Sequence, residues 1–489
     1  MIHERRTLLE ETLHSTRATP GPKFGRLRGF DSGAREIDDA AVVVAGDLPP
    51  WLRGSLLLNG PALWELPGGK LEHWFDGYGM WHAMRIDERG VRYRSRFAQS
   101  EAYRRSIAAG TPVYGEFGTA NPAGLLTRIR APQVTDNPAV VMSRHGERWL
   151  SVTETPFLTY FDPQTLQTLE RVSLGGKDEA MHLMSAHGFT LADGSYLNVA
   201  TALGPKCEMK LFRLRPGQSR PDVIARLKMP KSGYTHGFAL APGHAVLWET
   251  ALRAQPLAFR FGSSSYADNF RWEPQGGSVL HAVALDTGAV RSWRIPPMMA
   301  FHATQAWVEG SDLVLDIAIY DDGTVFEDLR LERLRNGLPS RSPMRHVRYR
   351  LRDGRGDAEP EAIAGAAIEL QQVHPDRIGR SRASVCWGAG FGEHGEFNDR
   401  TLRVDLDSGQ TALWQRPNAV QLEPLFVPRP GGSADDDGVL LVPTLADGDE
   451  TTVIGVIDAR SMQCLAELRT PQIVPFGFHA AFRPASMTM

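Results

Sequence analysis

Short segments that alternate apolar and polar residues recur along almost the whole chain of 489 residues, and each ends at a Gly, Pro, Asp or Asn. This pattern is typical of β-strands separated by tight turns. The clearest segments are SLLLNG, VRYRSRFA, WLSVTET, SYLNVAT, HAVLWET, SVLHAVAL, DLVLDIAIYD, TLRVDLD, GVLLVPTL and TVIGVID. No long amphipathic helical stretch supports an alternation of strands and helices. The sequence therefore predicts an all-β fold.

Four segments share a second pattern, in which a strand is followed by a turn that starts with Asp and then by another strand. They read DPQTLQTL, LDTGAVRSW, LDSGQTALW and IDARSMQCL. Such hairpins are typical of the outer edges of β-propeller blades, although they do not form a strict repeat. A prior of about 150 residues per domain would give about three domains. One large propeller over residues 1–489 explains both the length and the 48 glycines and 33 prolines. The alternative is two β-sandwich domains, with residues 353–365 as the best linker.

Composition excludes several classes of protein. The formal net charge of −3 gives no general attraction to nucleic acid. Three scattered cysteines are too few for a disulfide scaffold or a thiolate metal cluster. The N-terminal segment is charged and lacks the apolar core of a secretory signal. No apolar stretch approaches the ~20 residues that span a bilayer. The expectation is a soluble, cytoplasmic chain.

Four of the fifteen histidines share one context, because each stands at an end of a strand-like segment among small or aromatic neighbours. They are His187, His236, His302 and His479. The intervals between them correspond to roughly one, one and three propeller blades. Equivalent inner-strand positions of a propeller point at its axis, so these rings would converge on a metal ion. The alternative is four ordinary strand histidines, and His182 fits the pattern nearly as well as His187.

Four neutral imidazoles would suit Fe(II), Cu or Zn. The second ring nitrogen of a metal-bound histidine usually donates a hydrogen bond to an acceptor such as a carboxylate, which fixes the tautomer. Three glutamates lie in apolar, strand-like surroundings, where an unpaired carboxylate is costly: Glu154, Glu369 and Glu423. We expect them to support the histidines. The alternative is three exposed edge residues.

These residues and motifs are similar to those of the carotenoid cleavage oxygenase family, which includes the retinal pigment epithelium isomerohydrolase and bacterial stilbene-cleaving oxygenases. The resemblance runs from GSLLLNGPALWE and HWFDGYGMWHAMRI to VPFGFHAAF. It implies a seven-bladed β-propeller capped by a dome of loops and short helices, with one Fe(II) per chain. The family's four iron-binding histidines match His187, His236, His302 and His479, and its three supporting glutamates match Glu154, Glu369 and Glu423.

Other motifs, such as TDNPAVV, YTHGFAL and SYADNFRWEPQGG, resemble the animal β-carotene oxygenase and isomerohydrolase branch and its bacterial relatives. Aromatic residues line the substrate tunnel in that branch. The resemblance therefore implies substrate contacts for Phe75, Phe117 and Phe301. The alternative for each phenylalanine is ordinary core packing.

Two positions depart from the family's pattern. Tyr78 and Trp81 stand where the family has an acid and a leucine, and they predict a reshaped or narrowed tunnel mouth. Gly188 follows the first metal histidine where many members have proline. We expect a local change in the backbone there, with the ligand kept.

The resemblance implies a dioxygenase that uses O2 to cleave a conjugated double bond of a carotenoid or apocarotenoid into two carbonyl products. Stilbene-cleaving members hold the substrate's 4-hydroxyl with a lysine that precedes the residue matching Glu154. This chain has no lysine between Lys70 and Lys177, which disfavours that substrate. A stilbenoid- or phenylpropanoid-cleaving oxygenase, a non-redox isomerase on the same scaffold, and a non-catalytic binding propeller remain alternatives.

A lipophilic polyene substrate implies transient contact with a membrane surface, so the chain is expected to be cytoplasmic or peripherally membrane-bound. An apolar and basic patch at the tunnel mouth would make that contact. The segment LRAQPLAFRFG at residues 252–262 is a candidate.

Overall fold

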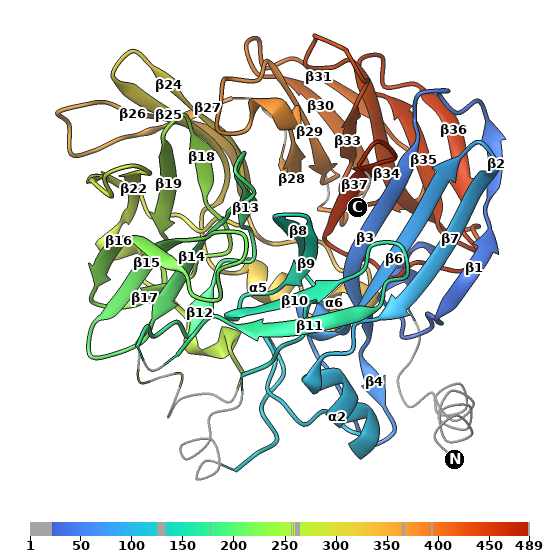
Figure 1. Ribbon diagram of the computed structural model, residues 1–489, viewed down its shortest axis with the longest axis horizontal. Helices are drawn as coiled ribbons and strands as arrows, with labels where there is room; N and C mark the ends of the chain where they lie inside the picture. Colours follow the sequence, from blue (N-terminus) through green and yellow to red (C-terminus); the bar gives the residue numbers. More distant parts are fainter. Residues whose placement is uncertain are drawn as a thin grey trace.

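A computed structural model describes residues 22–124, 134–176, 178–255, 257, 259, 265–363, 367–392 and 395–487. These residues form seven sheets of four to six strands and two smaller sheets, and all the strand pairs are antiparallel. In Figure 1 the sheets surround a common centre. The all-β prediction is confirmed for this part of the chain, since its longest helix is α2 (Glu101–Ala109).

The first sheet contains both the first and the last strand of the described residues. In spatial order its strands are β1 (Ile37–Ala41), β7 (Gly90–Phe97), β6 (Tyr78–Asp87), β3 (Gly54–Leu63) and β37 (His479–Pro484). The chain then passes from β1 to a different sheet, whose strands are β2 (Val43–Gly46), β36 (Cys464–Arg469), β35 (Val453–Asp458), β34 (Gly438–Ala446), β32 (Ala419–Gln421) and β33 (Leu425–Pro428). Two neighbouring sheets are thus each built from N-terminal and C-terminal strands.

Five sheets use consecutive segments between these ends. Two comprise β11 (Thr168–Ser173), β10 (Phe157–Phe161), β9 (Arg148–Val152) and β8 (Val141–His145), and β12 (Leu183–Met184), β13 (Phe189–Thr190), β14 (Tyr196–Ala202), β15 (Cys207–Leu214) and β16 (Asp222–Met229). The others comprise β18 (Ala239–Ala241), β19 (His244–Glu249), β22 (Ser278–Ala284) and β23 (Val290–Ile295); β24 (Ala303–Glu309), β25 (Asp312–Tyr320), β26 (Met344–Leu351) and β27 (Pro360–Ala362); and β28 (Ile368–Gln372), β29 (Val385–Gly390), β30 (Arg400–Asp405) and β31 (Thr411–Trp414).

The remaining elements are short. The two small sheets comprise β17 (Ser232–Gly233), β20 (Leu252–Ala254) and β21 (Arg271–Trp272), and β4 (Glu65–Leu66) with β5 (Gly69–Lys70). The helices are α2, α5 (Val325–Asp328) and α6 (Leu331–Arg335), and the 3-10 turns are η1 (Gly25–Phe30), η2 (Trp74–Asp76), η3 (Ala267–Asn269), η4 (Pro274–Gly276) and η5 (Pro375–Arg377).

The sequence patterns fall where they were expected. All ten alternating segments lie in or overlap strands. The four Asp-turn segments form the β10–β11, β22–β23, β30–β31 and β35–β36 hairpins, and three of these end in an outermost strand of their sheet. In the fourth hairpin β36 is covered by β2. Residues 353–363 of the linker candidate at 353–365 are described, and they include the loop from β26 to β27 and β27 itself. These two strands are neighbours in one sheet.

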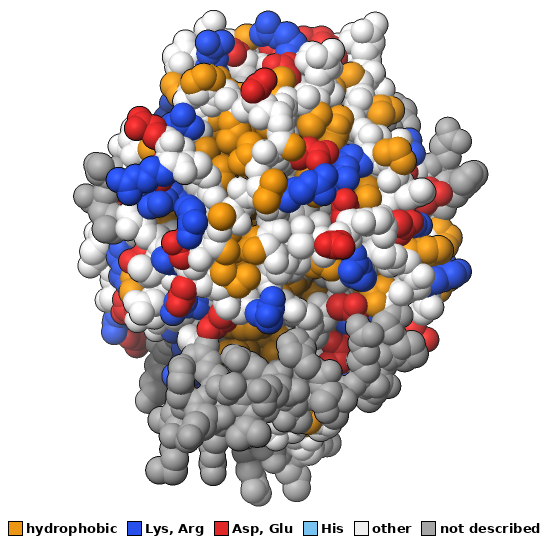
Figure 2. Space-filling view, turned by 90° about the vertical axis from the view of Figure 1, so that its right-hand side faces the viewer, with side chains coloured by type: hydrophobic (Ala, Val, Ile, Leu, Met, Phe, Trp, Pro, Cys, Tyr) orange, Lys and Arg blue, Asp and Glu red, His pale blue; other side chains and the backbone are white. Residues whose placement is uncertain are grey.

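Packing between neighbouring sheets forms the hydrophobic core. The fully buried indole of Trp81 on β6 stacks on Phe161 of β10, with ring centroids 4.5 Å apart, and so joins two sheets. On the outer face shown in Figure 2, hydrophobic side chains are interspersed with charged side chains of both signs. In the part of the chain that the structure describes, no helix is long and apolar enough to cross a membrane.

We expect Trp81→Ala to lower the free energy of unfolding by about 3–5 kcal/mol, because it removes a large side chain from a closely packed contact between sheets. Thermal unfolding followed by circular dichroism measures the loss. The matched control is Leu413→Ala, since Leu413 is half exposed on the outermost strand β31 and its loss should change stability by about 0.5 kcal/mol or less. Equal melting temperatures for the two variants would contradict this account of the core.

Candidate metal centre

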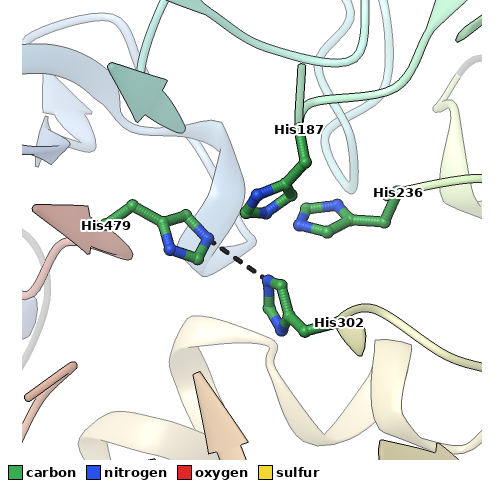
Figure 3. A group of neighbouring side chains, drawn as sticks. All are labelled: His187, His236, His302 and His479. Atoms are coloured by element: carbon green, nitrogen blue, oxygen red, sulfur yellow. Dashed lines mark hydrogen bonds between the residues drawn. The ribbon is translucent and has the colours of Figure 1, made fainter. Parts of the chain in front are cut away.

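Four imidazole rings meet at the centre of the ring of sheets. His187, His236 and His302 lie just before the strands β13, β18 and β24, and His479 is the first residue of β37. One nitrogen from each ring lies within 4.8 Å of the others, and Figure 3 shows the four rings directed toward one another. The structure therefore brings together the four histidines that the sequence singled out.

The arrangement of nitrogens fits a metal ion. Nε2 of His302 and Nε2 of His479 lie 3.2 Å apart, and the Nδ1 atoms of both rings face glutamate oxygens. If each Nδ1 carries the proton that it donates to its glutamate, both Nε2 atoms present bare lone pairs to each other. Nε2 of His187 is buried and has no hydrogen-bond partner among the described residues. Converging lone pairs need a cation between them, and neutral imidazoles suit Fe(II), Cu or Zn.

Glu154, at the end of β9, supports His236. Its Oε1 lies 2.6 Å from Nδ1 of His236 and also accepts a hydrogen bond from the hydroxyl of Tyr234. Tyr234 precedes His236 by two residues in GYTHGF, so one short segment provides both partners of this carboxylate. The contact fixes which nitrogen of His236 faces the cluster.

Glu369 supports His302 from a distorted strand. Its Oε2 lies 2.6 Å from Nδ1 of His302. Between Glu369 and Gln372 the register of β28 against β29 shifts, and Leu370 has a φ of 55°. A bulge of this kind changes the direction of a side chain, and a residue such as leucine adopts positive φ only at a cost. We attribute the orientation of Glu369 toward the cluster to this bulge.

Glu423 supports His479 and also anchors its backbone. Oε1 lies 2.8 Å from Nδ1 of His479, and Oε2 accepts a hydrogen bond of 2.7 Å from the backbone N–H of Ala480. The side-chain amide of Gln372 donates to the same Oε1 at 2.9 Å. All three glutamates predicted to support the histidines therefore contact one ring each.

Burial sets the protonation of the cluster. It lowers the pKa of His187 and of His236 well below the usual range, and the neighbouring imidazoles lower both values further. It also raises the pKa of Glu154 to about 8, against the hydrogen bond from Tyr234. Burial therefore favours the neutral form of His187 and His236, which is the form that binds metals.

His187 is held in a different way from the other three. Its backbone N–H bonds to Oγ of Ser185 at 3.2 Å, and Ser185 Oγ donates to the backbone oxygen of His236 at 2.7 Å. The buried ring of Tyr196 packs directly against Gly188, where an added Cβ would lie 2.3 Å from its Cζ and hydroxyl oxygen. Tyr196 is fixed in turn by Asn198, which donates to its hydroxyl at 2.9 Å. The glycine that replaces the family's proline thus makes room for a tyrosine ring.

A cavity of about 970 Å³ opens beside the cluster. His236, His302, His479, Glu154 and Glu369 are among its lining residues. So are all three predicted aromatic residues: Phe75 lies 5.0 Å from Phe117 and 6.0 Å from Phe301 between ring centroids, and Phe301 lies 5.2 Å from His236. Much of the wall comes from η2, η3, α5, α6 and loops outside the seven larger sheets. This volume is large enough for an extended apolar ligand.

The prediction of a narrowed tunnel mouth is wrong for the described residues. Neither Tyr78 nor Trp81 lines the cavity. Trp81 packs between sheets on Phe161, and Tyr78 is buried beside Tyr103 of α2. Both residues lie on β6, which is covered on both faces, so their bulk fills the core rather than the cavity.

Other residues settle questions that the sequence left open or missed. His182 lines the cavity wall but does not belong to the cluster, and its Nδ1 accepts the N–H of Leu203 at 2.8 Å. Sequence reasoning missed Tyr234 and the cavity-lining Glu116. The proximity of Tyr234 to His236 in the chain was a usable signal, whereas nothing in GEFGTA separates Glu116 from a surface carboxylate.

Comparisons with known proteins agree with this geometry. The family described as retinal pigment epithelial membrane protein matches residues 30–484. Carotenoid cleavage dioxygenase 8 homolog A of Oryza sativa is 30% identical, covering 95% of this chain and 89% of the relative. The human mitochondrial carotenoid-cleaving dioxygenase is 27% identical, covering 95% and 93%. The solved structure of cobalt-substituted Synechocystis apocarotenoid oxygenase has a TM-score of 0.83 at 25% identity, covering 94% and 98%. The similarity spans plant, animal and cyanobacterial proteins.

We expect Gly188→Ala to lower the amount of metal bound per chain, because the new Cβ would collide with the immobile ring of Tyr196 and displace His187. Metal analysis after reconstitution and dialysis measures the change. Gly33→Ala is the matched control, since an added Cβ at this exposed glycine meets nothing within 4 Å. Full metal content in Gly188→Ala would show that the packing of Tyr196 does not position His187.

Proposed function

The chain belongs to the carotenoid cleavage oxygenase family, and we propose that it is a non-haem Fe(II)-dependent dioxygenase that cleaves a conjugated double bond of a carotenoid or apocarotenoid into two carbonyl products. The observation that carries the proposal is the convergence of four buried or partly buried imidazoles on one point beside a large, mainly aromatic and aliphatic cavity. The relatives at 30% and 27% identity are named as carotenoid-cleaving dioxygenases.

The same proposal covers the architecture. The seven larger sheets would be the seven blades of a propeller, and residues 1–489 would form one domain. Three observations support this: the sheets surround one centre, N-terminal and C-terminal strands share two sheets, and the family match spans residues 30–484. Loops and short helices that line the cavity would be the dome.

One Fe(II) per chain would be held by His187, His236, His302 and His479. The ligands are neutral, so they leave the charge of the ion uncompensated, while Glu154, Glu369 and Glu423 return negative charge through the rings that they contact. When bound, the iron supplies the redox chemistry that activates O2 for reaction with an electron-rich double bond. Zinc is the less suitable ion by ligand number, because structural zinc sites are usually closed tetrahedra and catalytic ones have three protein ligands.

The chain itself would position the polyene and exclude water. Phe75 and Phe301 form a wall next to His236, and an apolar wall orients one double bond beside the metal through contacts along its length. Water excluded from the cavity cannot compete for reactive species. The proposed reaction needs no nucleophile or general base from the protein.

There are three alternatives. Two are enzymes that use the same iron site, and the third is a protein with the same fold and no catalytic activity. A stilbenoid- or phenylpropanoid-cleaving oxygenase is disfavoured because no lysine lines the cavity within the described ranges. A non-redox isomerase would leave the carbon skeleton intact and consume no O2. A propeller serving only as a binding module would hold no iron.

Contact with a membrane surface would let the enzyme collect its lipophilic substrate. Three exposed or partly exposed apolar side chains lie at the cavity: Leu257, Val134 and Leu338. Their exposed fractions are 67% for Leu257, 43% for Val134 and 46% for Leu338, so the three together offer apolar surface beside the cavity. The candidate segment 252–262 lies partly outside the described residues, at positions 256, 258 and 260–262.

We expect His236→Ala to abolish stoichiometric iron and all cleavage, because one of the four ligands is lost and Glu154 loses one of its two partners. Glu423→Gln should weaken both properties more gradually, since the ligand itself remains. Iron analysis and product assays measure the effects. The control is His244→Ala, whose Nδ1 lies 3.0 Å from the backbone oxygen of Pro242 and which does not belong to the cluster. Stoichiometric iron in His236→Ala would refute the ligand assignment.

The reaction is tested by incubating Fe(II)-loaded protein with a carotenoid, an apocarotenal and a stilbenoid under isotopically labelled O2. We expect two carbonyl fragments from a polyene, with label in the products, and no cleavage of the stilbenoid. Mass spectrometry identifies the fragments and the bond that breaks. An unlabelled product of unchanged mass would favour the isomerase, and cleavage of the stilbenoid alone would assign the other substrate class.

A further inference from the structure

One wall of the cavity is polar, although aromatic and aliphatic side chains dominate the rest. Glu116, Thr135 and Asn137 lie together on this wall. Asn137 is fully used by the fold, because its side chain bonds to the backbone of Gly77 and Gly79 at 2.8 Å each. Glu116 and Thr135 are therefore the side chains of this group that remain to be explained.

Glu116 is held in one position. It is 5% exposed, and Oγ1 of Thr135 donates to its Oε1 at 2.9 Å. Its backbone N–H donates to the backbone oxygen of Thr119 at 3.0 Å, and its backbone oxygen accepts the N–H of Tyr266 at 3.3 Å. Because the backbone and one carboxyl oxygen of Glu116 are fixed, its other carboxyl oxygen has a defined direction.

The surroundings of Glu116 favour its neutral form. No ion pair to Glu116 is found in the described part of the chain, and the neighbouring Asp76 and Asp136 are also acidic. Asp76 already accepts hydrogen bonds from the backbone of His73 and Gly118, at 3.1 and 2.9 Å. Burial raises the pKa of Glu116 well above its usual range, and the charge of Asp76 raises it further. A neutral carboxyl is a hydrogen-bond donor as well as an acceptor.

A purely structural role would need only the contact with Thr135. That contact uses Oε1, and no hydrogen bond to Oε2 is found among the described residues. A serine, asparagine or glutamine would satisfy Thr135 at a lower desolvation cost than a buried carboxyl. The spare oxygen, at the wall of a cavity suited to a long apolar ligand, indicates recognition of a polar atom on that ligand.

We propose that Glu116, oriented by Thr135, donates a hydrogen bond to a hydroxyl or carbonyl oxygen carried by the polyene substrate, so that the enzyme prefers oxygenated apocarotenoids to hydrocarbon carotenes. The inference rests on the proposed function and narrows its substrate class. Phe117, the next residue, contacts Phe75 at 5.0 Å, so the polar group adjoins the aromatic wall along which a polyene would lie.

Binding to the metal-free protein tests this assignment separately from catalysis. The probes are an apocarotenal, the matching apocarotenol and a hydrocarbon polyene with the same number of conjugated bonds, and quenching of tryptophan fluorescence reports their dissociation constants. We expect the wild type to bind both oxygenated probes more tightly than the hydrocarbon. Glu116→Leu should weaken binding of the oxygenated probes by roughly 10- to 100-fold, the effect of losing one buried hydrogen bond, with little change for the hydrocarbon.

Companion variants separate recognition from folding. Glu116→Gln keeps a donor and an acceptor and should retain the preference, whereas Thr135→Val should reduce it by loosening the carboxyl. Glu147→Leu makes the same chemical change at an exposed turn and should alter nothing. Circular dichroism verifies that each variant is folded.

The outcomes distinguish the two proposals. Equal weakening of all probes in Glu116→Leu, or no preference in the wild type, would overturn the role of Glu116 while leaving the dioxygenase intact. Selective binding without cleavage by the iron-loaded enzyme would overturn the proposed function and leave the assignment of Glu116 standing.

Discussion

The antiparallel pairing of β3 with β37 determines whether the central site can exist. It joins the last strand of the chain to one of the first, and its register places His479 opposite Asn59. Asn59 is itself fixed, because its side-chain amide donates to Pro138 and Ser151 at 3.1 and 3.0 Å. Three ligands come from the middle of the chain, so the fourth reaches them only when the ring of sheets is closed. The four-histidine cluster therefore depends on the pairing of β37 with β3.

Several buried histidines of this chain have partners that differ chemically from those of the cluster. His82, His145 and His346 each bond to a neutral hydroxyl, of Tyr93, Tyr160 and Thr304, at 2.6–2.8 Å. Three histidines of the cluster instead contact a buried glutamate through Nδ1 and direct Nε2 toward one another. A hydroxyl satisfies a neutral ring at little cost, whereas a buried carboxylate is favourable only if positive charge lies nearby. A carboxylate partner alone does not mark such a site, because Nε2 of the buried His281 also lies 3.0 Å from a carboxylate oxygen, that of Glu249. The cluster is distinguished by the convergence of four rings on one point.

Local patterns predicted much of this structure. Strand alternation and Asp-containing turns act over a few residues, so they gave the strands and the outer hairpins. The four histidines and three glutamates came from motifs, and the structure shows that His182 lies outside the cluster, with its Nδ1 accepting a backbone N–H from Leu203. The orientation of Tyr78 and Trp81 could not be derived, because the strand that carries them is buried on both faces and the alternation of side chains does not reveal which layer is the cavity. The cavity wall is built from loops distant in sequence, so Glu116 and Thr135 carried no local signal.

The uneven support of the four histidines follows from charge. Three glutamates contact the cluster, and a divalent ion offsets two negative charges, so the site already carries an excess of buried acid if all three ionise. Burial raises the pKa of Glu154 to about 8 even with Tyr234 donating to it, which shows how costly another carboxylate would be. His187 is accordingly fixed without one, by Ser185 and by the packing of Tyr196 on Gly188. The same limit applies to Glu116 in the cavity, where a neutral carboxyl provides polarity without adding to the buried charge. Where a further ionised group would destabilise the fold, packing and neutral hydrogen bonds fix the side chain instead.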